Sequence, residues 1–178
     1  ILGIGMVGKS SLAYRLVDYN GNDEHDPTIE DRFAVVEEID KKQVSINVVD
    51  TAGQQGYQNL LDTWIDIGEG FILVFAINDK ESFEDLDRKK ARIDLIKKKI
   101  KVPIVLVGNK SDMESSRKVS KKEAEEKAKS WDSLYFETSA KDNQNCKTPF
   151  IECARKILNL RQKTSDIEVK KDGCCNIF

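Results

Sequence analysis

Short apolar runs alternate along the chain with longer amphipathic stretches, a pattern typical of strands alternating with helices. Residues 70–77 and 102–107 are continuous apolar runs, as expected for strands buried on both faces. Residues 33–39 and 44–49 are β-rich and flank the polar stretch 40–43, so they predict a hairpin. A short run at residues 134–136 predicts one more strand.

The stretches between these runs have helical spacing. Residues 81–99 carry apolar side chains at intervals of three, four and seven. Ser120 and Glu123 form a capping box ahead of a Lys-, Glu- and Ala-rich stretch, and residues 150–160 predict a last amphipathic helix. Strands separated by helices of this length predict an α/β fold, with a mostly parallel sheet and helices on both faces.

The two ends of the chain differ from the rest. Ile1 and Leu2 directly precede a glycine-rich loop, where a whole strand is expected, so we expect the first strand to be largely missing from this chain. From Thr164 onward large apolar residues are few until the last four positions. We therefore expect one domain over residues 1–163 and a flexible tail over residues 164–178.

Composition and charge disfavour several classes of protein. Lysine and arginine number 29 against 31 acidic residues, a net charge of −2, which disfavours a nucleic-acid binder. The longest uncharged apolar run, residues 70–77, is far shorter than the roughly 20 residues of a membrane span. The cysteines and the single histidine lack metal-ligand spacing, so a zinc site is not expected.

A phosphate-binding loop is predicted at residues 3–10, where Gly-Ile-Gly-Met-Val-Gly-Lys-Ser fits the pattern G-x-x-x-x-G-K-[ST]. In such a loop the backbone N–H groups surround phosphate oxygens, assisted by the positive end of the following helix. We expect Lys9 to reach the β- and γ-phosphates and the Ser10 hydroxyl to hold Mg²⁺, with the Ser11 N–H at the α-phosphate. The alternative is a chance glycine turn.

The sequence Asn-Lys-Ser-Asp at residues 109–112 follows a predicted buried strand, at the sheet edge where α/β proteins bind ligands. A carboxylate at Asp112 can accept hydrogen bonds from the N1–H and exocyclic amine of guanine, a donor pair that adenine lacks. We expect Asn109 to brace the loop and the Lys110 stem to lie along the base. The alternative for Asp112 is a helix cap.

Two more segments complete the expected site. Ser139, Ala140 and Lys141 follow the short strand at residues 134–136, and the Ala140 N–H can donate to guanine O6. Taken alone, this segment fits a strand-ending turn equally well. Asp50 ends the strand at residues 44–49, where a carboxylate can reach Mg²⁺ through water, unless it only closes an Asx-turn.

Around this core, the Gly53 N–H can approach the γ-phosphate and Gln54 can orient the attacking water. Thr28 follows Pro27 in an extended loop, where its hydroxyl can complete the Mg²⁺ shell and its N–H can touch the γ-phosphate.

These motifs, in this order and spacing over nearly the whole chain, resemble the Ras family of small GTPases. The unbroken Asp-Pro-Thr-Ile-Glu-Asp at residues 26–31 is similar to the Ras branch rather than to Rab, Rho or Arf proteins. The resemblance implies a P-loop NTPase α/β fold in three layers, with a six-stranded sheet that has one antiparallel edge strand. It also implies switch loops around Thr28 and Gly53 that order with GTP.

The resemblance implies a GTP/GDP switch with Mg²⁺ as cofactor, hydrolysing GTP slowly as a monomer. Effector proteins would bind at residues 26–31, an exchange factor would load nucleotide, and an activating protein would stimulate hydrolysis. Arg32 falls after Thr28, so no built-in arginine finger is expected, and Gly5 would leave room for one from the activating protein.

The expected site residues are therefore as follows. Those expected to act in hydrolysis are Gln54, Lys9, Thr28 and Gly53. Those expected to bind nucleotide are Gly5, Val7, Gly8, Lys9, Ser10, Ser11, Thr28, Gly53, Asn109, Lys110, Asp112, Ser139, Ala140 and Lys141. Those expected to hold Mg²⁺ are Ser10, Thr28 and Asp50.

Several positions depart from the family pattern. Met6 stands where a second glycine is usual, and Gly21 replaces the aromatic residue that covers the guanine face. A base–aromatic contact is worth about 1–3 kcal/mol, so we hypothesise that nucleotide release is faster than in ordinary members. His25 replaces the switch tyrosine, and Gln55 stands where an acidic residue is usual, which leaves the exchange-factor contact open.

The last four residues, Cys175 to Phe178, fit a C-a-a-X prenylation signal that favours geranylgeranyl. One lipid gives marginal anchoring, and the tail charge is too small to supply the rest, so we expect Cys174 to carry a second lipid. The expected location is the cytoplasmic face of the plasma membrane or of endomembranes.

Two other functions compete with this one. The changes at Met6 and Gly21 could leave a nucleotide binder without a working hydrolytic cycle. A P-loop kinase or ATPase is the second alternative, which the guanine motif at residues 109–112 disfavours.

Overall fold

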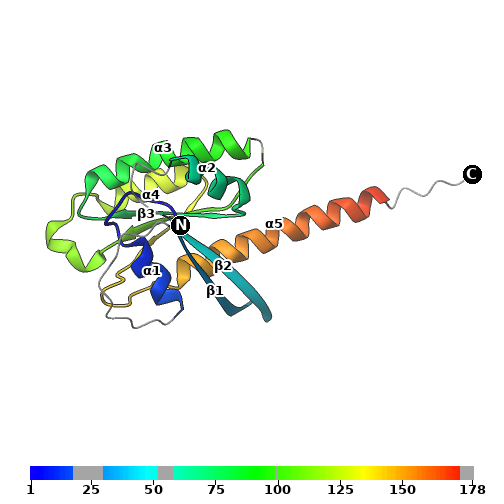
Figure 1. The fold of residues 1–178 in the computed structure, drawn as a ribbon, viewed down its shortest axis with the longest axis horizontal. Coiled ribbons are helices and arrows are strands. Elements are labelled where there is room, and N and C mark those ends of the chain that lie inside the picture. Colours follow the sequence, from blue (N-terminus) through cyan, green and yellow to red (C-terminus); the bar gives the residue numbers. More distant parts are fainter. Residues whose placement is uncertain (18–29, 52–57, 99, 173–178) are drawn as a thin grey trace, which may run out of the picture.

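The computed structural model describes residues 1–17, 30–51, 58–98 and 100–172, with parallel strands at the centre and helices on either side (Figure 1). Strands β3 (Phe71–Ala76), β4 (Ile104–Asn109) and β5 (Leu134–Glu137) form a parallel sheet in the order β3-β4-β5. Strands β1 (Glu30–Ile39) and β2 (Lys42–Thr51) pair as an antiparallel hairpin. The predicted strands and hairpin are all present.

Ile1 and Leu2 join the hairpin to the parallel sheet. Leu2 forms a parallel bridge with Leu73, with Leu2 N donating to Ile72 O and Val74 N donating to Leu2 O, both at 2.8 Å. On the other side, Ile1 N donates to Val49 O at 2.8 Å. These two residues therefore lie between β2 and β3 and link the hairpin to the parallel sheet.

The hairpin turn is tighter than predicted. Asp40 and Lys41 have φ of 51° and 65°, and Ile39 already pairs with Lys42. Two consecutive central residues with positive φ form a turn whose twist matches that of the two flanking strands in a two-residue hairpin. Strand pairing therefore takes in residues 42 and 43, which the sequence assigned to the turn.

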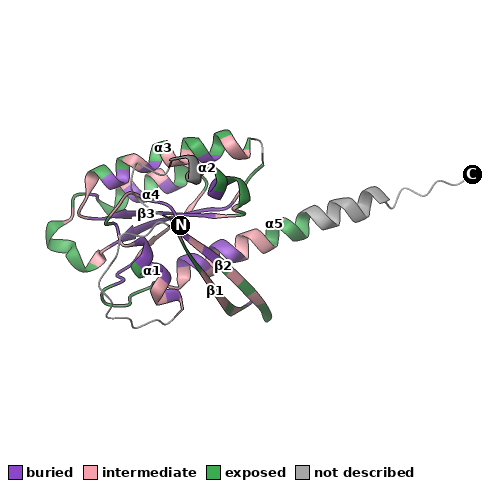
Figure 2. Cartoon of the chain, in the orientation of Figure 1, coloured by how far each residue is buried: buried purple, intermediate pink, exposed green. Residues whose placement is uncertain are grey.

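Helices cover both faces of the sheet. Alternate residues of β3 point to opposite faces, so each face contributes its side chains to a different apolar cluster. Phe71, Leu73 and Phe75 pack in one apolar cluster with α2 (Gln58–Ile67), α3 (Lys80–Lys97) and α4 (Lys121–Ser130). Ile72 and Val74 pack in a second cluster with α1 (Lys9–Leu16) and α5 (Thr148–Asp172). Figure 2 shows the buried strands between these two layers, which is the three-layer α/β fold that the sequence predicted.

Local capping explains where two of these helices begin. The Asp79 carboxylate accepts from Glu81 N and Ser82 N ahead of α3. Ser120 and Glu123 form both halves of a capping box at α4, with Glu123 N donating to Ser120 Oγ and Ser120 N donating to Glu123 Oε2. The capping-box prediction is confirmed. Helix α2 and the 3₁₀ helix η2 (Ser111–Ser116) were not predicted.

The last helix is longer than predicted. We expected it to end near Leu160 and a flexible tail to begin at Thr164, but α5 continues to Asp172. Residues 161–172 contain neither glycine nor proline, so no helix-breaking residue interrupts this stretch. The predicted helix end is wrong, and residues 164–172 are helical.

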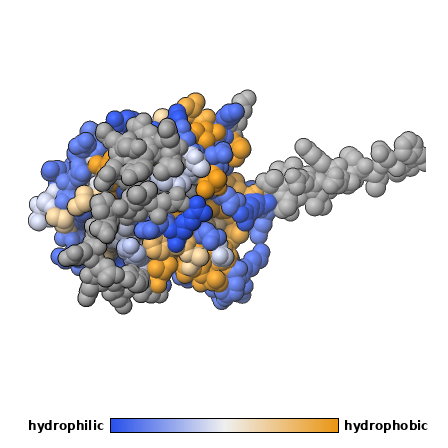
Figure 3. All heavy atoms as spheres, viewed as in Figure 1, coloured by the Kyte–Doolittle hydropathy of each residue, from blue (hydrophilic) through white to orange (hydrophobic). Residues whose placement is uncertain are grey.

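Polar side chains cover much of the described surface seen in Figure 3, while apolar side chains gather around the hairpin and near the ends of α2 and α3. Ile67 and Leu95 are exposed at those two helix ends. Across the described residues, none of the helices combines the length and apolar character needed to cross a bilayer.

Candidate nucleotide-binding site

The phosphate loop runs from Gly3 to Gly8 and leads directly into α1. Gly8 is the residue before the helix, with φ 91°, and makes no side-chain cap, so the first N–H groups of α1 are left for another acceptor. The first turn carries no acidic side chain either. Such a helix start attracts anions through its N–H groups and its dipole.

Protein neighbours require glycine at two loop positions. A Cβ at Gly3 would lie 2.4 Å from Val74 O, and one at Gly8 would lie 2.4 Å from Asn109 Nδ2. Among the residues that the structure describes, a Cβ at Gly5 would meet nothing within 4 Å. Gly3 and Gly8 are thus fixed by packing, whereas the space beside Gly5 is open, as a ligand or a partner's side chain would need.

Lys9, Ser10 and Asp50 come together at the base of this loop, and all three are buried. Lys9 Nζ donates to Ile4 O at 3.0 Å, and burial lowers the pKa of Lys9 to about 8. The Ser10 hydroxyl donates to Asp50 Oδ2, and burial raises the pKa of the Asp50 carboxyl despite this bond. Desolvation therefore outweighs the internal partners of both charged groups.

The other carboxylate oxygen, Asp50 Oδ1, is buried and has no hydrogen-bond partner among the described residues. A buried carboxylate oxygen without a partner costs free energy. Hydroxyl and carboxylate oxygens are the ligands that Mg²⁺ prefers. The Ser10–Asp50 pair therefore fits a magnesium ion.

Asn109 connects three separate segments behind the loop. Its Nδ2 donates to Val7 O at 2.8 Å, and its Oδ1 accepts from Thr138 Oγ1 at 3.0 Å and from Ala140 N at 3.3 Å. Asn109 is 1% exposed. A single side chain at the end of β4 thus fixes the phosphate loop and the loop after β5 relative to each other.

The residues predicted to contact the base lie on the solvent side of Asn109. Asp112 is exposed, and its Oδ1 accepts from Ser139 Oγ at 2.7 Å. Lys110 is half-buried and has φ 64° at the start of η2, while Lys141 is exposed. The structure therefore brings the two segments predicted to contact guanine into direct hydrogen-bond contact.

The sequence matches the Ras family over residues 1–159. The chain belongs to the Ras family. It is a small GTPase with the P-loop NTPase α/β fold, and its family hydrolyses GTP as a nucleotide-dependent switch and binds GTP or GDP with Mg²⁺.

In this Ras-family GTPase, one expected donor to the base already has a protein acceptor. The Ala140 N–H, expected to donate to guanine O6, donates to Asn109 Oδ1 through a long bond, so a base carbonyl would have to share it. Ser11 lies exposed on the first turn of α1 and Val7 is buried, with its carbonyl bound to Asn109.

Sequence reasoning missed Arg15. Its Nε donates to Ala140 O at 2.8 Å and its Nη2 to Lys141 O at 3.3 Å, so α1 holds the loop after β5 by its carbonyls. A basic residue in the last turn of a helix was the available signal, but it does not reveal which carbonyls are in reach.

Several expected residues lie outside the described residues, and their roles stay predictions. They are Thr28, Gly53 and Gln54 of the hydrolytic site, Gly21, His25 and Gln55 among the family departures, and Cys174 and Cys175 of the tail. Met6, another departure, is described: it has φ 66° and is 83% exposed.

Proposed function

We propose that this protein is a membrane-tethered GTP/GDP switch in signal transduction, loaded by an exchange factor and timed by slow hydrolysis that an activating protein stimulates. The observation that supports it best is the buried cluster of Lys9, Ser10 and Asp50, in which one carboxylate oxygen has no hydrogen-bond partner within the described part of the chain. The cluster places the Lys9 ammonium, and the oxygen ligands of Ser10 and Asp50 that suit Mg²⁺, at the start of a helix, where phosphates bind.

Each residue of the phosphate side has a distinct role in this proposal. The backbone N–H groups at the start of α1 and the Lys9 ammonium bind phosphate oxygens, and Ser10, Asp50 and Thr28 hold Mg²⁺. A Mg²⁺ ion held there would offset the negative charge of the phosphates. Lys9 stays protonated in use, because nearby phosphates raise a pKa that burial lowers to about 8.

Hydrolysis needs a positioned water, which we assign to Gln54, with the Gly53 N–H at the γ-phosphate. The open space beside Gly5 fits an arginine supplied by the activating protein. The guanine base is held by Asp112, by the Lys110 stem and by the Ala140 N–H, with Asn109, Ser139 and Lys141 shaping the pocket.

Output and location complete the proposal. Effector proteins bind residues 26–31 in the GTP state, and a prenyl group on Cys175 with a second lipid on Cys174 holds the protein at the cytoplasmic face of the plasma membrane or of endomembranes.

The proposal is tested by nucleotide identity and turnover. Mass spectrometry of the purified protein should find GDP or GTP, and ATP should displace fluorescent GDP roughly 10⁴-fold less effectively than GTP. Equal displacement by ATP would favour a P-loop kinase or ATPase. GTP binding without phosphate release in a single turnover would instead indicate a binder without a hydrolytic cycle.

The assignment of Gln54 has its own test. Gln54→Leu should bind GTP normally, but an activating protein should no longer stimulate its hydrolysis, because the water is not oriented. Full stimulated turnover in this variant would overturn the role of Gln54 while leaving the nucleotide assignment intact.

A further inference from the structure

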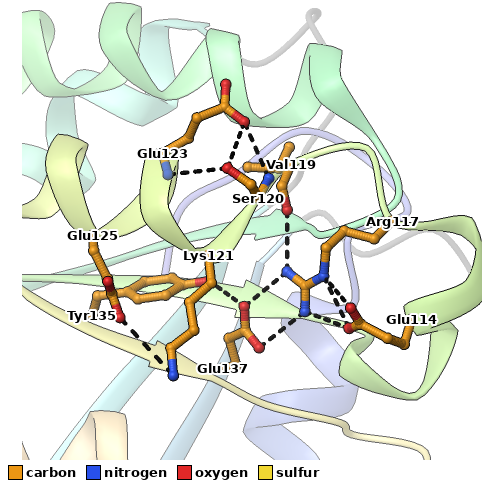
Figure 4. Close-up of polar contacts among 9 residues, drawn as sticks. All are labelled: Glu114, Arg117, Val119, Ser120, Lys121, Glu123, Glu125, Tyr135 and Glu137. Carbon is orange, nitrogen blue, oxygen red and sulfur yellow. Dashed lines mark hydrogen bonds and ion pairs between the residues drawn. The ribbon is translucent and has the colours of Figure 1, made fainter.

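A cluster of ion pairs lies behind the base-reading loops, centred on Arg117 (Figure 4). Its Nη1 donates to Glu137 Oε1 at 2.8 Å and to Val119 O at 3.1 Å. Its Nη2 donates to Glu137 Oε2 at 3.0 Å and to Glu114 Oε2 at 2.6 Å, and its Nε donates to Glu114. All the N–H donors of the guanidinium thus have acceptors.

The burial of this cluster decides which contact matters most. The side chains of Arg117 and Glu137 are 17% and 22% exposed, whereas that of Glu114 is 68% exposed. Exposed pairs contribute little, but removing one member of a shielded pair leaves the other charge without compensation. The two-point contact between Arg117 and Glu137 is therefore the part of the cluster that fixes geometry.

Glu137 is itself held from two further directions. The Tyr135 hydroxyl donates to Glu137 Oε1 at 2.8 Å, and the Tyr135 ring stacks on Phe75 in the apolar core at 6.3 Å between ring centroids. Asn145 Nδ2 donates to Glu137 O at 3.1 Å. The end of β5 is thus a rigid platform for the guanidinium.

This pair closes a ring around the base-reading loops. Arg117 follows the last residue of η2, and Asp112 lies at its start; Glu137 ends β5, and Ser139 comes two residues later. Arg117 joins Glu137 at one end of the ring, and Ser139 Oγ donates to Asp112 Oδ1 at the other. Between them, Ser111 N donates to Thr138 O at 3.0 Å.

We propose that Arg117 is a positioning residue for guanine recognition: through Glu137 it sets the separation of η2 and the loop after β5, and so holds the Asp112 carboxylate where it accepts from the base. The inference rests on the proposed function. In this proposal Arg117 acts through its protein contacts alone.

The test compares two nucleotides that differ only at the group read by Asp112. Inosine diphosphate lacks the exocyclic amine of GDP but keeps its N1–H, O6 and phosphates. A displaced Asp112 loses two hydrogen bonds to GDP and one to inosine diphosphate. Arg117→Met should therefore speed GDP release by about tenfold and inosine diphosphate release by only about threefold.

Two conservative variants separate geometry from folding. Glu137→Gln keeps the shape but removes the charge, and it should lower the same preference by a smaller factor. Arg117→Lys keeps a charge but not the two-point contact, so it should restore thermal stability more than it restores the preference for GDP.

Lys127→Met is the matched control. Lys127 has a side chain 13% exposed, and its Nζ donates to Phe83 O at 3.1 Å and to Asp87 Oδ2 at 2.8 Å. It joins α4 to α3 and not to the base-reading loops. Its loss should lower stability while leaving the ratio of the two release rates unchanged.

The outcomes are distinguishable. If the wild-type protein does not prefer GDP to inosine diphosphate, the proposed function fails. If it does, and Arg117→Met and Glu137→Gln speed release of both nucleotides equally, as a purely structural role predicts, the positioning role of Arg117 is overturned.

Discussion

The predicted base side and the predicted phosphate side of the nucleotide site differ in how far protein groups satisfy their polar side chains. On the base side, Asn109 alone makes three hydrogen bonds to protein groups, and Ser139 holds Asp112. On the phosphate side, Lys9 has a lowered pKa and Asp50 has a buried oxygen without a partner among the described residues.

This difference shows which half of the site has its polar groups satisfied by the protein without a ligand. The base side is already arranged by its own bonds, so binding there costs little reorganisation. The phosphate side carries desolvated charges that lack full compensation, so phosphate and Mg²⁺ supply interactions that the protein alone does not. Substitutions on the two sides should therefore separate stability from affinity.

The largest separation is expected at Lys9. Lys9→Met should weaken GDP binding by roughly 10²–10³-fold, because a shielded ion pair is lost. The melting temperature of the nucleotide-free protein should stay constant or rise, because a desolvated charge is replaced by an apolar chain of similar length. Titration of fluorescent GDP and thermal unfolding measure the two effects. A marked fall in that melting temperature would contradict the comparison.

Removal of Mg²⁺ is the next largest effect. Chelation with EDTA should speed the release of fluorescent GDP at least about tenfold, because Asp50 and the phosphates then repel each other. Asp50→Asn should respond much less to EDTA. Asn145→Ala, on the base side, should keep the full wild-type response; an Asp50→Asn variant that also keeps it would remove Asp50 from the metal site.

Asn109→Ala tests the base side. The loss of three buried hydrogen bonds should lower the free energy of unfolding by about 2–4 kcal/mol even without nucleotide, as measured by denaturant unfolding. Asn145→Ala removes one exposed bond, to Glu137 O, and should cost less than about 1 kcal/mol. Equal costs would mean that Asn109 does not organise the site.

Arg15 should give the smallest effect. Arg15→Met removes the bonds to Ala140 O and Lys141 O and should speed GDP release by about two- to tenfold. Arg155→Met is the control, because Arg155 pairs with Asp40 and Glu152 away from these loops. A stopped-flow comparison in which both variants release GDP equally fast would refute the specific role of Arg15.

Much of the fold followed from local patterns. The continuous apolar runs became β3 and β4, and the capping box at Ser120 and Glu123 formed as predicted. These signals act over a few residues, and burial on both faces leaves no alternative for such strands. The helix end near Leu160 was misjudged because the amphipathic spacing fades there, while residues 161–172 contain no helix-breaking residue.

The candidate site was predictable only in part. The loop pattern and the Asn-Lys-Ser-Asp motif are contiguous, so their residues could be named in advance. The contacts of Arg15 and of Arg117 could not, because these partners lie far along the chain and any of several carboxylates or carbonyls would satisfy a guanidinium.

The amino-acid sequence by itself determined the element types, the phosphate loop and the kind of nucleotide chemistry, because each depends on short-range spacing and side-chain type. Only the tertiary structure decided that Ile1 and Leu2 join two sheets, that Asn109 connects three segments, and that Asp50 keeps one oxygen without a partner among the described residues. Such pairings arise when distant segments close on one another, and which donors and acceptors meet is then fixed by packing rather than by any local pattern.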